Sequence, residues 1–351
     1  MSASLAMTVP LLALRDVVRD YGSGLAGRSA SLRAVDGVSL TVEKGEIVGI
    51  VGESGCGKST LARVVAALDR PTSGEVLLNG EDLVTMDKRA LLRRRDRFQM
   101  VFQDPYGSLD PRRRIGWSVA EPLGVLTPRL SKAETERRVA EMLEAVGLKA
   151  TDATRFPHEF SGGQRQRVAI ARALVTRPDL VIADEAVSAL DLSVQAQVLN
   201  LILDLRERTG AAFLFITHNL SVVEAICDRV AVMYRGRIVE SGATGEVFEA
   251  PRHPYTRLLL AAEPGRAGMA PDREEKSPPF PAEPGDWNGC AFRPRCVEAT
   301  ETCRREAPAS VDIAPADIAP ASRPVDWRAA CHHARATPPP APAGDLAAPR
   351  S

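Results

Sequence analysis

The sequence predicts an α/β fold with a mostly parallel β-sheet covered by helices, and three observations lead to it. Short apolar runs of strand length alternate with helical stretches between about residues 11 and 250, which is the order of elements in α/β proteins. The apolar run 46–51 leads directly into a glycine-rich loop and then into the apolar stretch 61–68, so the local order is strand, loop and helix. The apolar run 180–183 ends in two carboxylates, Asp184 and Glu185.

The remaining elements follow in chain order. A β-rich opening from Leu11 to about Leu78 contains the glycine loop, and a helical region follows over about residues 105–174. Within that region, apolar residues at i, i+3, i+4 and i+7 predict a helix with one buried stripe. These residues are Val139, Met142, Leu143 and Val146. The strand before Asp184, a helix over about 193–208 and a strand over 211–217 complete the alternation.

The glycine loop is a full match to the P-loop pattern. Its residues are Gly52, Glu53, Ser54, Gly55, Cys56, Gly57, Lys58, Ser59 and Thr60. Glycines let backbone N–H groups converge on phosphate oxygens, and the following helix turns its positive end towards the same anion. In this pattern Lys58 reaches the β- and γ-phosphates of a nucleotide and the Ser59 hydroxyl ligates Mg²⁺. Cys56 is interpreted as a small loop residue.

The acidic strand end supplies the complementary groups. Asp184 is expected to hold the Mg²⁺ ion, and Glu185 is expected to orient and deprotonate the attacking water. Alone this pattern is weak, because many strands end in acidic turn residues. It becomes informative because a P-loop precedes it in the same chain.

A third motif lies between these two and makes the interpretation specific. It consists of Phe160, Ser161, Gly162, Gly163 and Gln164, directly before the helical stretch that ends at Leu174. A helix N-terminus there presents N–H groups and a dipole to an anion. With the three motifs in this order, the chain over roughly residues 11–250 resembles the nucleotide-binding subunits of ABC transporters.

The resemblance implies a fold and further roles. The fold is a P-loop NTPase of ABC type, with an antiparallel β subdomain and a helical subdomain over about 105–174 that carries the third motif. Tyr21 resembles the aromatic that stacks on adenine, and Gln103 the glutamine that senses the metal and the γ-phosphate. Asp191 matches the loop that crosses to the partner ATPase, and His218 the switch histidine near the γ-phosphate.

The same resemblance implies that the third motif of this chain acts on a nucleotide bound to a second subunit. In the family, the motif at Ser161, Gly162, Gly163 and Gln164 contacts the ATP bound to the P-loop of a second ATPase, so that two subunits close around two ATP molecules. Because this chain has a single copy of each motif, we expect an obligatory partner. That partner is a paralogous ATPase or, alternatively, a second copy of this chain, and closure would drive two membrane permease subunits.

One position departs from the family pattern. Ala186 stands where the family usually has proline directly after the catalytic glutamate. Proline would bias Glu185 towards extended backbone geometry, so alanine loosens that restraint without removing a catalytic group. Asn219, where relatives often carry Asp, is a similarly mild change.

The C-terminal part narrows the resemblance to one branch. Residues 251–259, which include His253, Pro254 and Tyr255, resemble the His-Pro-Tyr segment that follows the ATPase core in subunits of oligopeptide and dipeptide importers. The stretch 101–109 resembles the second of the two paralogous ATPases of that branch. These likenesses imply an ATPase domain over 11–250, a small irregular extension over 251–335 and a disordered tail over 336–351.

Four of the six cysteines lie in the extension, and they suggest a metal site. Disulfides are not expected in a reducing cytosol, which leaves a four-thiolate centre formed by Cys290, Cys296, Cys303 and Cys331. Spacings of five, six and twenty-seven intervening residues fit neither a close-paired zinc site nor the commonest ferredoxin runs. The resemblance favours a [4Fe–4S] cluster, with Zn²⁺ as the alternative and the neighbouring His332 and His333 as further candidate ligands.

The composition of the chain limits which functions are expected, and several cargoes remain as alternatives. The 45 basic and 45 acidic residues balance, so no nucleic-acid partner is expected. No apolar run reaches the ~18–20 residues of a membrane span, so the membrane path is expected in other chains. The resemblance implies an ATPase at the cytoplasmic face of the bacterial inner membrane, served indirectly by an extracytoplasmic peptide-binding protein. The alternatives are a soluble ABC ATPase outside transport and an importer ATPase for nickel, glutathione or sugars.

Overall fold

The computed structural model describes residues 9–22, 32–104, 107–126, 128–188, 190–263, 289–313 and 327–334. The chain divides into two compact units, Met1–Ile238 and Val239–Ser351. The tail expected over residues 336–351 lies outside the described residues. Among the described residues, no helix has the length and apolar character that crossing a membrane would require.

The first unit opens with a four-stranded antiparallel sheet. Its strands are β1 (Leu12–Tyr21), β2 (Leu32–Val42), β4 (Ser73–Leu78) and β5 (Glu81–Asp82), in the order β2-β1-β4-β5. Apolar side chains of these strands, such as Leu14 and Val38, are buried, whereas their polar neighbours face outwards. The structure therefore confirms the β-rich opening and the antiparallel subdomain.

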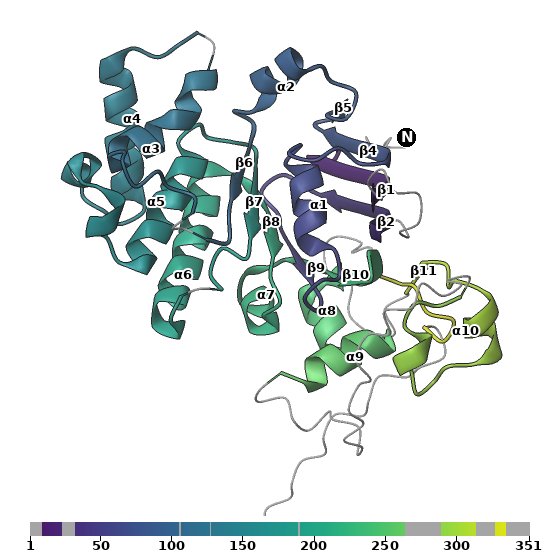
Figure 1. The fold of residues 1–351 in the computed structure, drawn as a ribbon. Helices are drawn as coiled ribbons and strands as arrows, with labels where there is room; N and C mark the ends of the chain where they lie inside the picture. The colour runs from purple at the N-terminus through teal and green to yellow at the C-terminus, as the bar shows by residue number, and fades with distance from the viewer. Residues whose placement is uncertain are drawn as a thin grey trace, which may run out of the picture. The chain divides into compact units, whose positions relative to one another are not determined.

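A parallel sheet forms the centre of the same unit. Its strands are β9 (Arg229–Tyr234), β3 (Ile47–Val51), β8 (Ala212–Ile216), β7 (Leu180–Asp184) and β6 (Phe98–Val101), in the order β9-β3-β8-β7-β6. Every residue of β3, β7 and β8 is buried, as expected for strands covered on both faces. The prediction of a mostly parallel, helix-covered sheet is confirmed (Figure 1).

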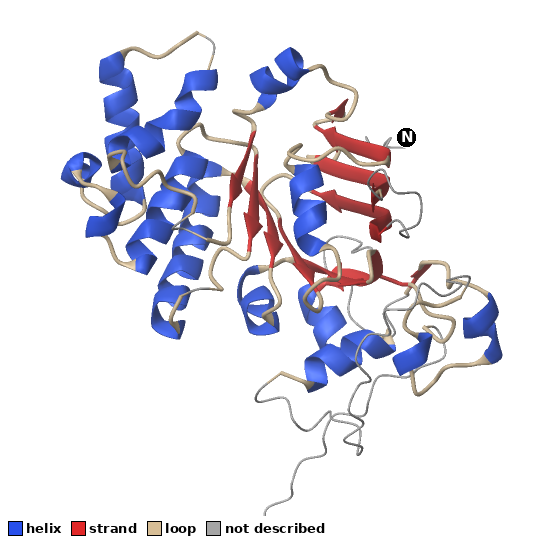
Figure 2. Ribbon diagram, viewed as in Figure 1, coloured by secondary structure: helices blue, strands red, loops and turns tan. Residues whose placement is uncertain are grey.

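Helices cover this sheet and form a separate layer beyond its β6 edge (Figure 2). The sheet helices are α1 (Lys58–Val65), α6 (Leu192–Thr209) and α7 (Leu220–Ile226), and α2 (Lys88–Arg94) precedes β6. The helical layer contains α3 (Ile115–Ala120), η1 (Glu121–Val125), α4 (Lys132–Ala145), η2 (Ala150–Thr154), η3 (Pro157–Glu159) and α5 (Gly162–Leu174). This layer is the expected helical subdomain.

The helix predicted from the apolar stripe is α4. It begins at a hydrogen bond from the backbone N–H of Glu134 to the hydroxyl of Ser131, which caps its first turn. Val139 and Leu143 are fully buried, and Val146, the residue after the last turn, is buried as well. Three of the four stripe residues therefore face the interior as predicted, and the fourth, Met142, is half-buried.

One hydrophobic core joins α1 to both sheets. Its members include Leu14 and Val17 of the antiparallel sheet, Leu61 of α1, and Ile50 and Leu214 of the parallel sheet. Burying a side chain of this size contributes about 1.5–3 kcal/mol. The core thus fixes α1, and with it the glycine loop, against both sheets.

The second unit consists of short elements. They are β10 (Arg237–Ala243), α8 (Thr244–Glu249), α9 (Pro254–Ala261), η5 (Arg293–Arg295), α10 (Glu301–Arg305), β11 (Val311–Asp312) and β12 (Arg328–Ala329). Strand β12 pairs antiparallel with both β10 and β11. The compact unit begins at Val239, before the extension expected over 251–335, so β10 and α8 belong with the short elements that follow them.

The His-Pro-Tyr segment begins α9. His253 is the N-cap residue, and its Nδ1 accepts a hydrogen bond from the backbone N–H of Tyr255 at 3.0 Å. Pro254 occupies the first turn, where a missing N–H costs nothing. His253 and Tyr255 are both buried. The segment is therefore part of the folded core of the extension.

Burial makes this histidine sensitive to acid. Desolvation, assisted by the charge of Arg257, lowers the pKa of His253 from 6.5 to about 3. A histidine with a depressed pKa contributes stability above its unfolded pKa, and this contribution is lost as the pH falls from 6.5 towards 3. The loss amounts to at most about 1.4 kcal/mol for each pH unit.

We therefore expect the midpoint of urea unfolding of the extension, followed by tryptophan fluorescence, to fall between pH 6.5 and 4.5. His253→Asn is the matched control, because asparagine keeps the capping acceptor and does not titrate. Losing the imidazole ring also removes packing contacts, but that loss of unfolding free energy is the same at every pH. The difference between the two proteins in the slope of the unfolding midpoint against pH therefore reports the titration of His253. Equal pH slopes in the two proteins would contradict the role assigned to His253.

Candidate nucleotide-binding site

The glycine loop connects β3 to α1 and depends on its glycines. Gly52, Gly55 and Gly57 have positive φ values of 153°, 79° and 110°, a backbone region that other residues rarely adopt. A Cβ on Gly57 would lie 2.1 Å from the carbonyl oxygen of Ala34, and one on Gly52 would lie 2.1 Å from that of Met233. The loop is therefore pressed against neighbouring backbone at both ends.

Lys58 begins α1 and its ammonium group folds back over the loop. Its Nζ donates to the carbonyl oxygens of Gly52 at 2.7 Å and Glu53 at 2.9 Å. The side chain is only 5% exposed. A buried cation held at the mouth of a helix N-terminus makes this point of the loop strongly positive.

Ser59 and Asp184 meet at the carboxyl end of the sheet. The Ser59 hydroxyl donates to Oδ1 of Asp184 at 3.2 Å. Burial and the neighbouring charge of Glu185 raise the pKa of Asp184, and the hydrogen bond from Ser59 opposes that shift. The two side chains offer hard oxygen donors side by side, which is the donor set that Mg²⁺ prefers.

Glu185 is held by two further predicted residues. Its Oε2 accepts from Nε2 of Gln103 at 2.7 Å, and its Oε1 lies 3.1 Å from Nδ1 of His218. Three segments of the sheet's carboxyl edge therefore converge on one carboxylate. Glu185 also has a positive φ of 48°, which is uncommon for a residue with a side chain.

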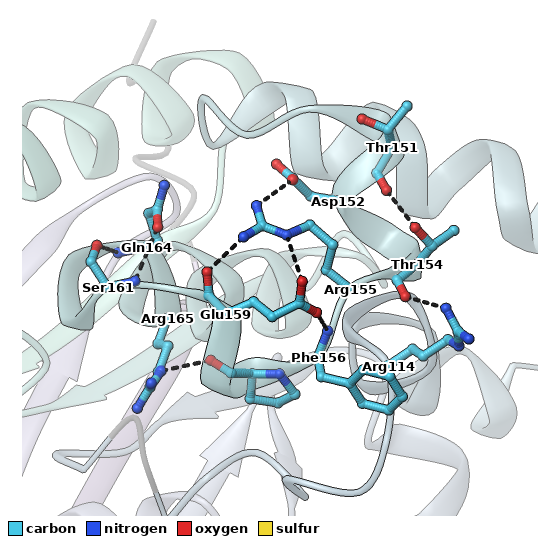
Figure 3. A network of polar contacts seen from close by, with 11 residues as sticks. Arg114, Thr151, Asp152, Thr154, Arg155, Phe156, Glu159, Ser161, Gln164 and Arg165 are labelled. Carbon is cyan, nitrogen blue, oxygen red and sulfur yellow. Dashed lines mark hydrogen bonds and ion pairs between the residues drawn. The ribbon is translucent and has the colours of Figure 1, made fainter.

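The third motif is placed at the start of α5 as a capping box (Figure 3). The Ser161 hydroxyl accepts from the backbone N–H of Gln164 at 3.3 Å, and the Gln164 side chain accepts from the N–H of Ser161 at 3.0 Å. These reciprocal bonds fix the first turn of the helix. Ser161 and Gln164 are exposed, so this turn faces outwards.

The two glycines of this turn have different surroundings. A Cβ on Gly163 would lie 2.4 Å from Cγ1 of Val194 in α6, so packing within the chain requires glycine there. A Cβ on Gly162 would have no atom within 4 Å. The fold of this unit therefore gives no reason for glycine at position 162.

A network of polar contacts supports the segment that leads into this turn (Figure 3). Arg155 pairs with Asp152 at 3.0 Å and donates to the carbonyl oxygen of Glu159 at 2.6 Å. The Glu159 carboxylate accepts from the backbone N–H of Phe156 at 2.6 Å. The Arg155 guanidinium also lies 4.4 Å from the ring centroid of Phe160. These contacts fix residues 155–160, and with them the approach to Ser161.

Two predicted site residues lie outside the converging group. Tyr21 ends β1, its hydroxyl donates to Asp69 at 3.0 Å, and the guanidinium of Arg19 lies 4.6 Å from its ring centroid. Asp191 is the exposed residue before α6 and makes no capping hydrogen bond through its side chain. Of the loop 188–191 that contains it, Ala189 lies outside the described residues.

Sequence reasoning missed two features of the site. The capping box was readable, because Ser161 followed three residues later by Gln164 is its known spacing. The left-handed backbone of Glu185 was not, because it is set by contacts distant in sequence. The N–H of Glu185 donates to the carbonyl of Ile216, on a neighbouring strand of the sheet, at 2.8 Å.

The cysteines of the second unit lie near one another. Burial raises the pKa of Cys290, with a smaller contribution from the charge of Cys303. Burial raises the pKa of Cys296 to about 11, and the charges of Glu298, Cys331 and Cys290 add to the shift. Among the described residues, however, no three His, Cys, Asp or Glu side chains come close enough to hold a single metal ion. That geometry does not support the zinc alternative.

Comparison with known families matches both units. Residues 35–188 match the model of the ABC transporter family. Residues 239–303 match the model described as oligopeptide/dipeptide transporter, C-terminal region. The two matches cover the glycine loop and the His-Pro-Tyr segment respectively.

Three curated relatives align with most of this chain. The dipeptide transport ATP-binding protein DppF of Haemophilus influenzae is 48% identical over 81% of this chain and 87% of its own length. The protein of the same description in Escherichia coli is 47% identical, covering 85% and 90%. The di/tripeptide transport ATP-binding protein DppF of Pseudomonas aeruginosa is 45% identical, covering 92% and 98%.

Solved structures agree on the fold. The dimeric ATP-binding cassette MJ0796 bound to ADP and Pi superposes with a TM-score of 0.60 at 31% identity, over 66% of this chain and 98% of that structure. The cbiO1 protein of Clostridium perfringens, part of the ABC transporter complex cbiONQ, gives a TM-score of 0.60 at 26% identity, covering 74% and 97%. The expected ABC-type fold is thus confirmed.

The loop geometry predicts unequal costs for two alanine substitutions. Gly57→Ala introduces a Cβ 2.1 Å from the Ala34 carbonyl at a φ of 110°, so we expect a loss of about 3 kcal/mol or more in unfolding free energy. Gly55→Ala has open space at a φ of 79° and should cost only about 1–2 kcal/mol. Urea denaturation of both variants measures the difference, and equal costs would disprove the close approach.

Proposed function

This chain belongs to the ATP-binding subunits of ABC transporters that carry the oligopeptide/dipeptide C-terminal region, and we propose that it hydrolyses ATP to power import of dipeptides or oligopeptides across the bacterial inner membrane. The observation that carries the proposal is the presence in one chain of both family regions, at residues 35–188 and 239–303. The likeness to DppF proteins supports a place as the second of two paralogous ATPases, bound at the cytoplasmic face through two permease subunits.

We assign the nucleotide site as follows. The phosphates of ATP bind the loop 52–60, where Lys58 supplies positive charge. Ser59, Asp184 and Gln103 hold Mg²⁺, which neutralises developing charge on the phosphate oxygens. The hydrogen bond between Ser59 and Asp184 supports this assignment, because it brings two oxygen donors together at the end of the loop.

Glu185 is proposed as the general base for the attacking water. Its contacts with Gln103 and His218 support the role, because they hold the carboxylate by both oxygens. His218, at the end of β8, then reports on the γ-phosphate. Tyr21 is proposed to stack on adenine, and its bond to Asp69 would fix the ring orientation.

The start of α5 is proposed to act on the partner subunit's nucleotide. Ser161, Gly162, Gly163 and Gln164 present the helix N-terminus, and Gly162 leaves room for a closely approaching phosphate because a Cβ there would meet open space. Asp191 would lie at the same subunit boundary. The partner is a paralogous ATPase or a second copy of this chain, and a peptide-binding protein outside the membrane delivers cargo.

We propose domain limits to match these roles. The ATPase domain runs over residues 11–250, with its helical subdomain at about 105–174, and the extension runs over 251–335. The first family region, 35–188, lies within the proposed ATPase domain, whereas the second region and the second compact unit both begin at residue 239, before the proposed extension. Limited proteolysis with mass mapping of the products would test them.

We further propose that the extension holds a [4Fe–4S] cluster through Cys290, Cys296, Cys303 and Cys331. Support comes from the chemistry of the donors, since four thiols gather in one small unit. In a zinc site every thiolate sulfur lies about 2.3 Å from one ion, whereas in a [4Fe–4S] cluster each of the four thiolates binds a different iron, so the sulfurs lie farther apart. When bound, such a cluster supplies a redox-active or structural centre.

Metal analysis tests this cofactor directly. Anaerobically purified protein should contain iron and acid-labile sulfide in equal amounts. Replacement of Cys303 by serine should lower both. Stoichiometric zinc without sulfide, or no metal at all, would refute the cluster.

Two substitutions test the ATPase assignment. Lys58→Ala should weaken ATP binding, because it removes the buried charge at the phosphates. Glu185→Gln should leave binding intact and lower turnover by about 10²-fold or more, trapping an ATP-bound dimer. ATP binding, hydrolysis and dimer formation are measured on purified protein with its ATPase partner. Unchanged turnover in either variant would overturn the site.

A glycine pair tests action in trans. Gly162→Ala should leave stability unchanged or raise it by up to about 1 kcal/mol, because alanine favours helix, yet it should reduce hydrolysis sharply by blocking the partner's phosphate. Gly163→Ala should destabilise the unit through its clash with Val194. Thermal unfolding and ATPase assays on both variants separate the effects. Normal hydrolysis in Gly162→Ala would contradict close approach at this turn.

Transport tests the function as a whole. Uptake of a labelled dipeptide and a labelled longer peptide is compared in cells lacking this gene, complemented by wild type or by Glu185→Gln. Uptake restored by wild type alone establishes ATP-driven peptide import and ranks cargo by length. Normal peptide uptake in the deleted cells, with ATPase activity intact, would refute peptide as the cargo.

A further inference from the structure

The four cysteines of the extension lie on two separate described segments. Cys290, Cys296 and Cys303 belong to residues 289–313, whereas Cys331 belongs to residues 327–334. The backbone N–H of Cys290 donates to the carbonyl of Cys303 at 2.8 Å, which ties the first segment to itself. The position of Cys331 relative to the other three therefore depends on contacts that hold the second segment.

A buried carboxylate makes one of those contacts. Glu240 of β10 is 1% exposed. Its Oε1 accepts from the indole Nε1 of Trp327 at 3.1 Å and from the backbone N–H of Arg252 at 2.8 Å, and its Oε2 accepts from the N–H of His253 at 2.9 Å. A buried carboxylate is costly unless hydrogen bonds satisfy it, so these three donors are held strongly.

Trp327 directly precedes β12, the strand that leads to Cys331. In β12, Ala329 pairs with Glu240, and the N–H of Ala330 donates to the carbonyl of Val239 at 2.8 Å. The Trp327 ring lies against Gly242, where a Cβ would come within 2.9 Å of it. Cys331 follows directly after these anchored residues.

The His-Pro-Tyr segment supports the part of the chain between Cys290 and Cys296. The ring centroids of His253 and Tyr255 lie 5.6 and 5.5 Å from that of Phe292. Phe292 is 3% exposed and stands between Cys290 and Cys296. Tilted aromatic contacts at this separation are favourable.

We propose that Glu240, His253, Tyr255 and Trp327 form a frame that positions the four thiols. Glu240 joins the two halves of the frame, because the same carboxylate binds the start of α9 and the indole that anchors β12. The frame residues are positioning residues and bind no metal themselves. The purpose of the frame rests on the proposed four-thiol centre. The contacts that make up the frame do not depend on it.

Two substitutions separate the halves of the frame. Trp327→Phe removes the indole donor and keeps an aromatic ring, so we expect alkylation of Cys331 to accelerate about tenfold, which corresponds to the loss of one hydrogen bond to a charged group. The other three cysteines should keep their rates. Tyr255→Leu keeps an apolar side chain and should accelerate Cys290 and Cys296 while sparing Cys331.

The experiment uses the full chain, with iron chelated under reducing conditions, pulsed with a maleimide and mapped by mass spectrometry. Glu75→Gln, which removes an exposed ion pair with Arg15 in the first unit, is the control and should change no rate. Glu240→Gln provides a second variant if Trp327→Phe folds poorly. A uniform rise at all four cysteines, or no rise, would overturn the frame.

Iron content distinguishes this inference from the proposed cofactor. If wild type binds iron and sulfide, Trp327→Phe should lower both. If wild type binds none, the cofactor proposal fails, and the selective labelling pattern still decides whether the frame exists.

Discussion

The first unit depends on the close approach of the glycine loop to the backbone around it. Gly57 lies so close to the carbonyl of Ala34 in β2, and Gly52 to that of Met233 in β9, that neither position has room for a Cβ atom. The carbonyl of Cys56 accepts from the N–H of Gly236 at 2.8 Å, and Gly236 in turn accepts from Asp36 at 2.9 Å. The loop therefore packs against strands of both sheets, and this packing fixes the positions of Lys58 and Ser59.

The charged side chains of the site are ordered by one another. Lys58 is bonded to loop carbonyls, Ser59 to Asp184, and Glu185 to both Gln103 and His218. Each neutral hydrogen bond contributes only about 0.5–1.5 kcal/mol net, and those to charged groups about 1.5–3 kcal/mol. Bonds of this strength hold the groups in place and still allow exchange of partners during a reaction cycle.

The sequence was sufficient for those parts of the site that are local. The loop 52–60, the acidic pair at 184–185 and the helix that begins after Ser161 were all predictable, because each is a short motif at the end of a regular element. The contacts of Tyr21 with Asp69 and of Glu185 with Gln103 join residues far apart in the chain, and no local pattern encodes them. The same holds in the second unit, where the hydrogen bonds of the buried Glu240 come from donors in two segments distant in sequence.

The cap of α5 has a consequence for the chemistry of its surface. The Ser161 hydroxyl uses a lone pair to accept from Gln164, and its own hydrogen stays available for donation to an oxygen outside the helix. Aspartate caps helices as well as serine does, but it offers no hydrogen and adds negative charge at the point where an anion would dock. A neutral cap such as this serine stabilises the helix and keeps its end receptive to phosphate, whereas an aspartate cap would stabilise the helix and repel the anion.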